Sequence, residues 1–509
     1  IAFFLLYKDI AVHLSRETMK ILFRAAFFIL LLVSVTFSQN DAFTRAIDSL
    51  FRVHYSDTTV GVSIGVIYKN PVTNEFIKRY FYHGEKDRTT HARPDSATVY
   101  QIGSVTKTFT AMVMAHMLRY NMANRYDLIK SYLPDSLRVP YWLNGSDTTK
   151  INLIELVTHF SGLIDEPPAI SYPYTINHMF RYLDTCHLLT KPDSIWRYSN
   201  IGFATLATGL TMHAGRDSIE QLFQQIITDS LGMPDTKITR TLSMILRSAK
   251  GYIKNNSNVW VLADSNKSTW PAFNGAGAIR STIKDMTTYL EYQMKLTNSP
   301  LNPLLDSMHK HIKRINPGAP TQQWQGMAWA SNRLKFQLNN PWIQFKDGGT
   351  PGYNSFITFY TDSVTGIKGG VVILSNSGTS TNFNNSGFIE ALSMDVLQYL
   401  HSVYSTIGIE PVNSNVPERF ELKQNYPNPF NPSTNIEFSV VNSSTHSNEP
   451  VNISVYDVSG RLVRTLLNNE LKAGNYKVSF NASDLASGVY YYSMNAGSFK
   501  ETRKMIILK

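Results

Sequence analysis

The order in which strand and helix patterns follow one another is the feature that most limits how this chain can fold. Two strand patterns come early, three come late, and the segment between them, from Ile151 to about Leu246, has mainly helical patterning. The predicted strands are Val60–Tyr68, Phe76–Tyr82, Trp342–Lys346, Asn354–Tyr360 and Lys368–Ser375, and a helix is predicted over Asn384–Tyr404. This order fits an α+β fold in which one antiparallel sheet, assembled from both ends of the sequence, is covered by helices and accompanied by an all-helical region.

A change of composition after Tyr404 indicates a second domain. At 509 residues the chain is too long for one ordinary domain. Residues 405–420 are rich in proline, asparagine and serine, which is typical of a linker. Residues 421–509 contain only short strand patterns separated by turns. We therefore expect a large domain over residues 39–404 and a small C-terminal β-sandwich over residues 421–509.

An apolar run near the N-terminus predicts export. Met19-Lys-Ile-Leu-Phe-Arg24 is a short basic start, and the run from Ala25 to Val35 is apolar except for Ser34. Such a pattern is typical of a secretory signal peptide and is short for a spanning helix. We expect residues 1–38 to be an upstream extension and a signal peptide that starts at Met19, and the mature protein to have no stable membrane span. The alternative is an N-terminal membrane anchor.

Charge and cysteine content exclude several classes of function. The net charge is +10, but the lysines and arginines are spread out and form no basic run interleaved with aromatic residues. We therefore expect no nucleic-acid partner. The single cysteine, Cys186, cannot form an internal disulfide, and no Cys/His spacing is typical of a zinc site. No metal or cofactor is expected.

Ser104 and Lys107 lie where a loop turns into an apolar helix. Residues three apart share a helix face, so the Lys107 amine can reach the Ser104 hydroxyl. A desolvated lysine can take the proton of a serine and make it a nucleophile. The alternative is a Ser104 that only caps the helix, with Lys107 in solvent. The same spacing recurs at Ser281/Lys284 and Ser307/Lys310, so spacing alone does not decide between the two interpretations.

Two further motifs favour the catalytic interpretation. Tyr198 and Asn200 are two apart in an extended loop and can point the same way. The tyrosine can relay a proton if nearby ammonium groups lower its pKa, and the asparagine can hold a substrate. Lys346, at the end of a predicted strand, would supply positive charge, followed by Gly348 and Gly349, which let a substrate approach closely. Each motif also occurs elsewhere by chance, and it is the conjunction that counts.

The backbone N–H groups of Gly349 and Ser104 could form an oxyanion hole. A formal match to the nucleophile elbow of α/β-hydrolases is rejected. It is Gly61-Val-Ser63-Ile-Gly65, and the strand pattern continues through it into a hairpin instead of turning into a helix.

These motifs resemble the serine β-lactamase and penicillin-binding-protein superfamily, in its class C-like branch of esterases, D-aminopeptidases and carboxypeptidases. The resemblance spans about residues 40–400. It is carried by Ile102-Gly-Ser-Val-Thr-Lys107, Leu156-Val-Thr-His159-Phe-Ser-Gly-Leu163, Tyr198-Ser-Asn-Ile-Gly202, Gly275-Ala-Gly-Ala-Ile-Arg-Ser-Thr-Ile-Lys-Asp285-Met and Gly348-Gly-Thr-Pro-Gly-Tyr353.

The resemblance implies a role for each matching residue. Ser104 would be the acylated nucleophile, and Lys107 and Tyr198 would act together as the general base. Asn200 and Lys346 would bind the substrate and supply electrostatic stabilisation. His159 invites a histidine-based triad, but in this family its segment is the end of a scaffold helix.

One position departs from the pattern of lactam-hydrolysing relatives. Many of them carry Ser or Thr between the lysine and the glycine, which donates a hydrogen bond to a substrate carboxylate. Asp347 stands there in this chain, and an ionised aspartate cannot donate and repels a carboxylate. We therefore expect a secreted serine hydrolase acting on an ester, an amide or a D-amino-acid peptide. The alternatives are a catalytically silent penicillin-recognising sensor and a true β-lactamase or DD-carboxypeptidase.

The C-terminal segment resembles the type A sorting domain of the type IX secretion system. The resemblance covers about residues 421–509 and is carried by Asn425-Tyr-Pro-Asn-Pro-Phe-Asn-Pro-Ser-Thr434, Val455-Tyr-Asp-Val-Ser-Gly-Arg461, Leu485-Ala-Ser-Gly-Val-Tyr490 and Lys504-Met-Ile-Ile-Leu-Lys509. It implies the type IX machinery as a partner and a protein that is secreted or held at the cell surface. The alternative is a carbohydrate-binding or adhesive β-sandwich.

Overall fold

The computed structural model describes the chain from Phe43 onwards with several gaps. The described residues are 43–55, 60–69, 75–168, 173–257, 259–263, 270–318, 322–333, 341–361, 368–378, 387–405, 409–413, 417–441, 449–471, 473–482 and 485–508. The chain divides into two compact units, residues 1–56 and 57–509, and residues 43–54 of the first are helical. The predicted signal peptide and upstream extension lie outside the described residues. Within those residues no helix is both long and apolar enough to cross a membrane.

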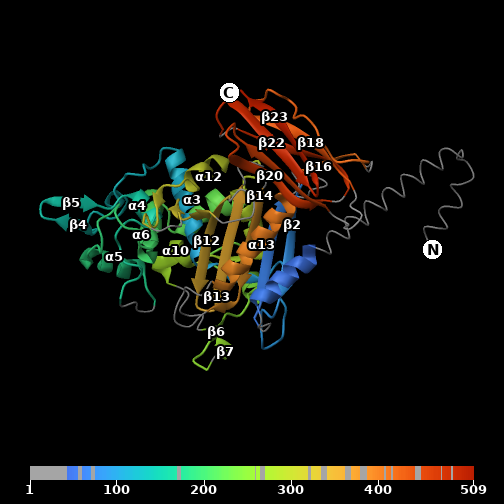
Figure 1. The fold of residues 1–509 in the computed structure, drawn as a ribbon. Coiled ribbons are helices and arrows are strands. Elements are labelled where there is room, and N and C mark those ends of the chain that lie inside the picture. The colour runs from blue at the N-terminus through green and yellow to red at the C-terminus, as the bar shows by residue number, and fades with distance from the viewer. Residues whose placement is uncertain are drawn as a thin grey trace, which may run out of the picture. The chain divides into compact units, whose positions relative to one another are not determined.

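The second unit contains an antiparallel sheet of eight strands in the order β2-β1-β14-β13-β12-β11-β10-β9 (Figure 1). Its strands are β1 (Val62–Lys69), β2 (Phe76–His83), β9 (Lys313–Arg314), β10 (Trp324–Gln325), β11 (Ala330–Arg333), β12 (Trp342–Thr350), β13 (Tyr353–Thr361) and β14 (Lys368–Ser375). The early strand β1 pairs with the late strand β14, with Val62 opposite Ser375. The predicted assembly of one sheet from both ends of the sequence is confirmed.

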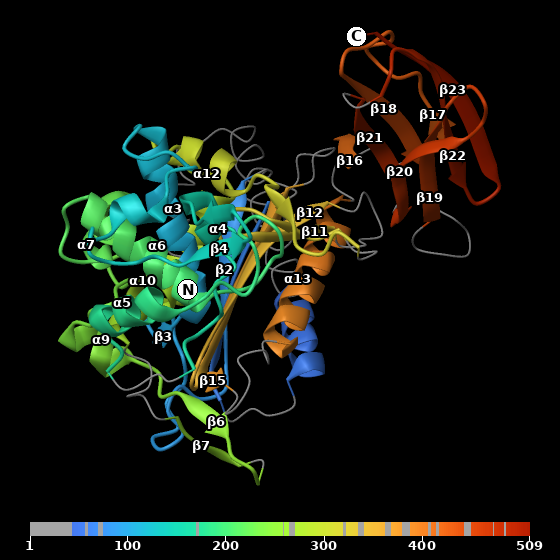
Figure 2. The ribbon, with the colours of Figure 1, turned by 90° about the vertical axis from the view of Figure 1, so that its left-hand side faces the viewer.

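Helices cover both faces of this sheet. Helix α11 (Ile283–Gln293) packs on β1 and β14, and α13 (Gly387–Ser405) packs on β13 and β14. Figure 2 shows the sheet nearly edge-on, with α13 on one side and the helical region on the other. The two consecutive glycines Gly369 and Gly370 show why both sides are occupied. A Cβ on Gly370 would lie 2.6 Å from the sulfur of Met294, just after α11, whereas one on Gly369 would contact Tyr360, whose ring packs on His401 of α13.

The helical region is built around two apolar helices, α3 (Thr106–Arg119) and α6 (Asn200–His213), both buried on almost all sides. Around them lie α4 (Leu153–Val157), α5 (Ile176–Thr185), α7 (Ile219–Phe223), α8 (Asp229–Leu231), α9 (Leu242–Arg247), α10 (Asn274–Gly277) and α12 (Asn302–Met308). Short strands complete this unit: β3 (Val99–Gln101) with β8 (Arg280–Thr282), β4 (Tyr141–Asn144) with β5 (Asp147–Lys150), and β6 (Tyr252–Lys254) between β7 (Trp260–Leu262) and β15 (Ser377–Gly378). The predicted helical middle of the sequence is confirmed.

The C-terminal segment forms two four-stranded antiparallel sheets around an apolar core of its own. One has the order β16-β21-β18-β17 and the other β20-β19-β22-β23. The strands are β16 (Ile409–Asn413), β17 (Glu421–Leu422), β18 (Ser433–Val440), β19 (Glu449–Tyr456), β20 (Leu462–Leu471), β21 (Gly474–Asn481), β22 (Gly488–Ala496) and β23 (Phe499–Ile507). The prediction of a small β-sandwich is confirmed.

The predicted linker over residues 405–420 needs a correction. Ile409–Asn413 forms β16 and pairs with β21, and α13 ends at Ser405. Pro411 lies in this strand, which is paired on one side only, as edge strands with proline usually are. The composition of the segment is therefore that of an edge strand as well as of a linker.

Candidate active site

Ser104 lies in a tight turn, the 3-10 turn η1 (Gly103–Val105), that leads directly into α3. Gly103 has a left-handed backbone, and a Cβ on it would lie 2.7 Å from the main-chain nitrogen of Gly349. Only glycine combines this conformation with so close an approach. Neither η1 nor α3 has a side-chain N-cap hydrogen bond, so the structure does not show Ser104 acting as a helix cap.

The amine of Lys107 lies one turn further along α3, fully buried. Its Nζ is 3.0 Å from Ser104 Oγ, 2.6 Å from Asn200 Oδ1 and 2.7 Å from the carbonyl oxygen of Ala276. The last two groups can only accept hydrogen bonds. The structure thus brings Ser104 and Lys107 together, and Lys107 is not a solvated residue of the first helical turn.

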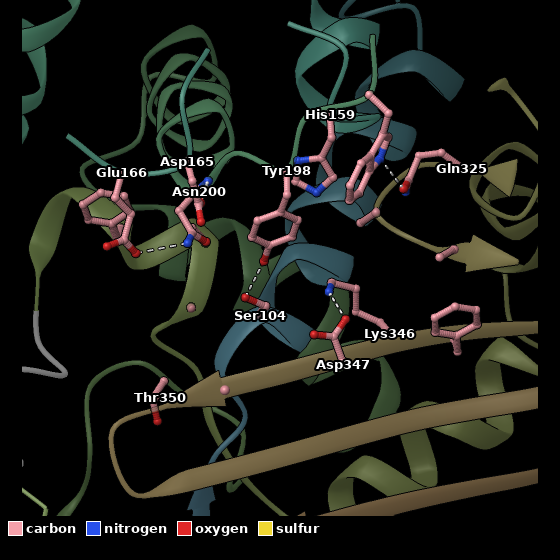
Figure 3. A pocket seen from close by; sticks show the side chains of 18 of the residues that line it. Ser104, His159, Asp165, Glu166, Tyr198, Asn200, Gln325, Lys346, Asp347 and Thr350 are labelled. Atoms are coloured by element: carbon pink, nitrogen blue, oxygen red, sulfur yellow. Dashed lines mark hydrogen bonds and ion pairs between the residues drawn. The ribbon is translucent and has the colours of Figure 1, made fainter. Parts of the chain in front are cut away.

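Tyr198 also contacts Ser104, and Lys107 Nζ lies 5.0 Å from the centroid of its ring. Its hydroxyl donates a hydrogen bond of 2.6 Å to Ser104 Oγ (Figure 3). Tyr198 immediately precedes Ser199, the N-cap of α6, whose hydroxyl accepts from the Gly202 N–H. This cap fixes the start of α6 and with it the direction of the chain at Tyr198. Ser104 Oγ therefore contacts two candidate proton carriers, one from α3 and one from the loop that leads into α6.

Asn200 orients the lysine. Its Oδ1 accepts from Lys107, while its Nδ2 donates to Glu166 Oε1 at 3.1 Å and its main-chain N–H donates to Asp165 Oδ1 at 3.0 Å. These partners fix the orientation of the amide, because its oxygen must face the amine and its nitrogen the carboxylate.

Burial shifts the pKa values of both candidate proton carriers. It lowers the pKa of Lys107 well below its usual value, and the charge of Lys346 lowers it further. It raises the pKa of Tyr198 well above its usual value, with the negative charge of Asp347 adding to the effect. A lowered pKa is expected from the sequence for a tyrosine that relays a proton, whereas the pKa of Tyr198 is raised. Burial thus favours the unprotonated amine of Lys107 and the neutral phenol of Tyr198.

Strand β12 brings Lys346, Gly348 and Gly349 to the same place. A Cβ on Gly348 would lie 2.2 Å from the carbonyl oxygen of Ile102 and 3.0 Å from the main-chain nitrogen of Ser104. Gly348 is therefore required for β12 to lie against the turn that carries Ser104. The backbone of Gly349 adjoins this turn at Gly103, as a pair of oxyanion donors from Gly349 and Ser104 requires.

Lys346 is already paired with a carboxylate. Its Nζ lies 2.7 Å from Asp347 Oδ1, and the lysine side chain is 6% exposed whereas that of the aspartate is 50% exposed. Burial raises the pKa of Asp347, but the charge of Lys346 and their hydrogen bond outweigh it and leave the pKa below its usual value. Asp347 is thus ionised and faces the solvent side of the site. The positive charge expected for substrate binding is largely compensated within the protein.

A cavity of about 790 Å³ opens in front of Ser104. Four carboxylates line it: Asp165, Glu166, Asp347 and Glu390. In Figure 3 Asp165 and Glu166 lie on one side of Ser104, and the pair Lys346–Asp347 lies on the other. Burial raises the pKa of Asp165, Glu166 and Glu390, which means that their environment disfavours negative charge unless a cation enters.

Two residues weighed from the sequence lie elsewhere or play another part. Ser63 is buried in β1 and bonded to the hydroxyl of Tyr100 at 3.0 Å, so it does not line the cavity, and its exclusion as nucleophile agrees with the structure. His159 does line the cavity, but its Nδ1 is occupied by a hydrogen bond from the Ser199 N–H. It has no hydrogen bond to Ser104 within the part of the chain that the structure describes.

The sequence did not point to Asp165, Glu166, Glu390 or Ala276. Asp165 and Glu166 follow the motif Leu156–Leu163 in a segment that has no recognisable sequence pattern. Glu390 lies on α13 and reaches the cavity only through the folding of that helix against the sheet. Ala276 contributes a main-chain carbonyl, for which a side-chain motif carries no signal.

Comparison with known families agrees with both parts of the chain. A family model described as Beta-lactamase matches residues 47–392. A second model, described as Secretion system C-terminal sorting domain, matches residues 424–508. The C-terminal β-sandwich is thus a sorting domain, which indicates export by the type IX secretion system to the cell surface or the medium.

Individual relatives and solved structures that resemble this chain are named as D-alanine carboxypeptidases or beta-lactamases. The chain is 28% identical over 336 residues to the D-alanyl-D-alanine-carboxypeptidase/endopeptidase AmpH of Escherichia coli (strain K12), covering 62% of this chain and 80% of the relative. Among solved structures it resembles a beta-lactamase/D-alanine carboxypeptidase from Yersinia pestis, with a TM-score of 0.55, 21% identity, and 70% of this chain and 99% of that chain covered. A class C beta-lactamase from Rhodobacter sphaeroides has a TM-score of 0.55, 18% identity and coverages of 71% and 99%. At these identities the solved structures establish the fold.

Proposed function

The chain belongs to the beta-lactamase family, and from this premise we propose that it is an exported serine hydrolase that forms an acyl-enzyme at Ser104. The observation that carries the proposal is the position of Ser104 Oγ, 3.0 Å from Lys107 Nζ and 2.6 Å from the Tyr198 hydroxyl. Acyl transfer from a serine needs a base that removes its proton and an acid that protonates the leaving group, roles that one group or two can fill. A candidate for each role is within hydrogen-bond distance here.

Lys107 is the proposed base. In its neutral form the amine has two hydrogens and one lone pair. Asn200 Oδ1 and the Ala276 carbonyl can only accept, so they take the two hydrogens, and the lone pair is left to face Ser104. The Ser104 hydroxyl then donates to Lys107 and accepts from Tyr198, which satisfies all of these groups at once.

Acylation follows from this arrangement. Lys107 takes the Ser104 proton as Oγ forms a bond to the substrate carbonyl carbon, and the N–H groups of Ser104 and Gly349 stabilise the oxyanion. When the bond to the leaving group breaks, Tyr198 gives its proton to the departing oxygen or nitrogen and regains one from the Lys107 ammonium. A water then attacks the ester, with the same groups removing its proton and returning one to Ser104, and releases the acid.

The charges around Ser104 support a neutral or cationic substrate end, as in an ester, an amide or a D-amino-acid peptide. The compensated Lys346 offers little net attraction to a carboxylate, and the ionised Asp347 repels one. The name of the Escherichia coli relative includes an endopeptidase activity. Cleavage inside a D-peptide needs no terminal carboxylate, so it is also compatible with these charges.

A labelling and hydrolysis experiment tests this proposal. A fluorophosphonate probe should label the purified protein and not its Ser104→Ala variant. In a panel of p-nitrophenyl esters, D-amino-acid amides, internal D-alanyl peptides and nitrocefin, we expect turnover of the first three classes to exceed that of nitrocefin. An unlabelled folded protein that binds fluorescent penicillin without turnover would instead identify a silent sensor. Nitrocefin turnover as fast as that of the esters would identify a true β-lactamase.

A further inference from the structure

One residue, His159, holds the chain on both sides of Tyr198. The carbonyl oxygen of His159 accepts from the Arg197 N–H at 2.8 Å, and its imidazole Nδ1 accepts from the Ser199 N–H at 3.1 Å. Both amides that flank Tyr198 are therefore bonded to the same histidine. No other residue in the described part of the chain is shown bonded to both of these amides.

The imidazole of His159 also packs on the phenol itself. The two ring centroids are 4.5 Å apart with an interplanar angle of 32°, and the ring of Phe203 lies behind the imidazole at 4.9 Å. Figure 3 shows the imidazole beside the Tyr198 ring, on the side away from Ser104. His159 is 2% exposed, so it has little freedom to move. The imidazole restricts the movement of the Tyr198 ring, while the hydrogen bonds of His159 fix the backbone on either side of it.

The backbone conformation of His159 is unusual, and it allows the contacts that hold the chain around Tyr198. Its backbone is left-handed, with φ of +63°, which is uncommon for a residue with a side chain. This conformation lets the carbonyl and the imidazole of one residue address two amides that are two positions apart. Such local strain is retained where the surrounding structure requires it.

The hydrogen bond from the Ser199 N–H also determines the tautomer of the His159 imidazole. An Nδ1 that accepts an N–H bears no proton, so the neutral ring carries its proton on Nε2. Burial lowers the pKa of His159 well below its usual value, and the charges of Lys107 and Lys346 lower it further, which agrees with a neutral ring. A protonated ring would place a hydrogen on Nδ1 facing the Ser199 N–H.

We propose that His159 is a positioning residue for the reaction: it holds the segment Arg197–Ser199 so that the Tyr198 hydroxyl stays in hydrogen-bond contact with Ser104. The inference rests on the proposed function, because it assigns a reason for the placement of the proton-donating phenol. His159 exchanges no proton with substrate or nucleophile. The acceptor at Nδ1 is the group that matters, and the ring is secondary.

A matched pair of variants tests the positioning role. Asparagine and leucine have nearly the same shape, but only the asparagine oxygen can replace Nδ1 as acceptor for the Ser199 N–H. We expect His159→Leu to lower kcat by about 10²-fold, because a displacement of a reacting group by roughly 1 Å has an effect of this size. His159→Asn should stay within about tenfold of the wild type, because the buried N–H keeps a partner. KM should change little in either, since Tyr198 acts only in the chemical step.

The rates are taken per active site, titrated with the fluorophosphonate, and thermal unfolding of each variant is recorded beside them. If His159→Leu does not fold, His159→Phe, which keeps a ring against Tyr198 but lacks the acceptor, provides the comparison with asparagine. Equal kcat for the variants with and without an acceptor would overturn the proposal, as would loss of activity in His159→Asn as complete as in Ser104→Ala, which would make His159 a proton carrier. A wild type that is itself unlabelled and inactive would refute the proposed function instead.

Discussion

The charge state of Lys107 controls whether Ser104 can react. A protonated amine cannot take the serine proton, so kcat/KM should rise with pH through the pKa of Lys107 and then level off. Burial and the charge of Lys346 lower this pKa, so the rise should occur below the value of a free lysine, about 10.4. The measurement is kcat/KM for a p-nitrophenyl ester against pH, corrected for spontaneous hydrolysis. Lys107→Arg, which stays protonated, should be inactive throughout. An active arginine variant would contradict Lys107 as the base.

We expect the charge of Asp347 to set a preference between substrates. Replacing it with threonine removes a negative charge from the side of the site that a lactam carboxylate would face and frees Lys346 from its ion pair. We expect Asp347→Thr to raise nitrocefin turnover relative to ester turnover by about tenfold, which corresponds to ~1.4 kcal/mol. Asp347→Asn is the isosteric control and should give part of this gain through charge alone. An unchanged ratio in both variants would show that Asp347 does not select substrates.

Which site residues could be predicted from the sequence depends on how they reach the site. Ser104 and Lys107 are one helical turn apart, and Tyr198 and Asn200 are two residues apart, so local geometry alone suggested that each pair acts together. That the two pairs meet is a tertiary fact, which only the family resemblance suggested. Glu390 has no local motif, and the motif that contains Ala276 assigns no role to its carbonyl oxygen. Their part in the site depends on long-range packing, which spacing in a sequence does not encode.

The junction between β12 and the turn before α3 is the contact between elements on which the proposed oxyanion hole depends. A methyl group on Gly348 would meet the Ile102 carbonyl at 2.2 Å, so Gly348→Ala must separate the strand from the turn. We expect a loss of about 10²–10³ in kcat, as for the removal of one oxyanion donor. Gly277→Ala, in the same cavity, is the matched control, since its nearest new contact is 3.9 Å. Equal rates for the two variants, measured with the ester, would contradict this assignment.

Strands that are buried on both faces could be predicted from their continuous apolar sequence, whereas very short strands could not. Strands β1, β13 and β14 are buried almost throughout and read as continuous apolar runs, so their existence and approximate bounds were predicted correctly. Strands β9, β10 and β11 have two to four residues each, too few for any periodic pattern, and were not predicted. Strand β20 was also missed. Apart from the buried Leu467, its residues whose burial is described are partly or fully exposed, and it pairs with β19 through two irregularities in register.

At the scale of the whole molecule, hydrolase and sorting functions lie in segments with separate apolar cores. Deleting residues 406–509 should leave the hydrolase folded and active but retained in the periplasm. The deletion starts at 406 because β16 belongs to the sandwich and would lose its partner β21 if the cut were made at 421. Ester hydrolysis in periplasmic and extracellular fractions measures the outcome. Release of the truncated protein at the level of the full chain would show that the sandwich is not needed for export.

The pairing of β1 with β14 joins parts of the chain that are made far apart in time. Next to this pair, Gly61 donates its N–H to the side chain of Asn376, 315 positions later. Ser104 and Lys107 leave the ribosome early, whereas the strand that carries Gly349 comes two hundred residues afterwards and can be seated only in a completed sheet. A chain interrupted anywhere between them lacks Gly349, one of the two proposed oxyanion donors. We therefore expect hydrolytic activity only from a chain that includes β12 and the strands that pair with it.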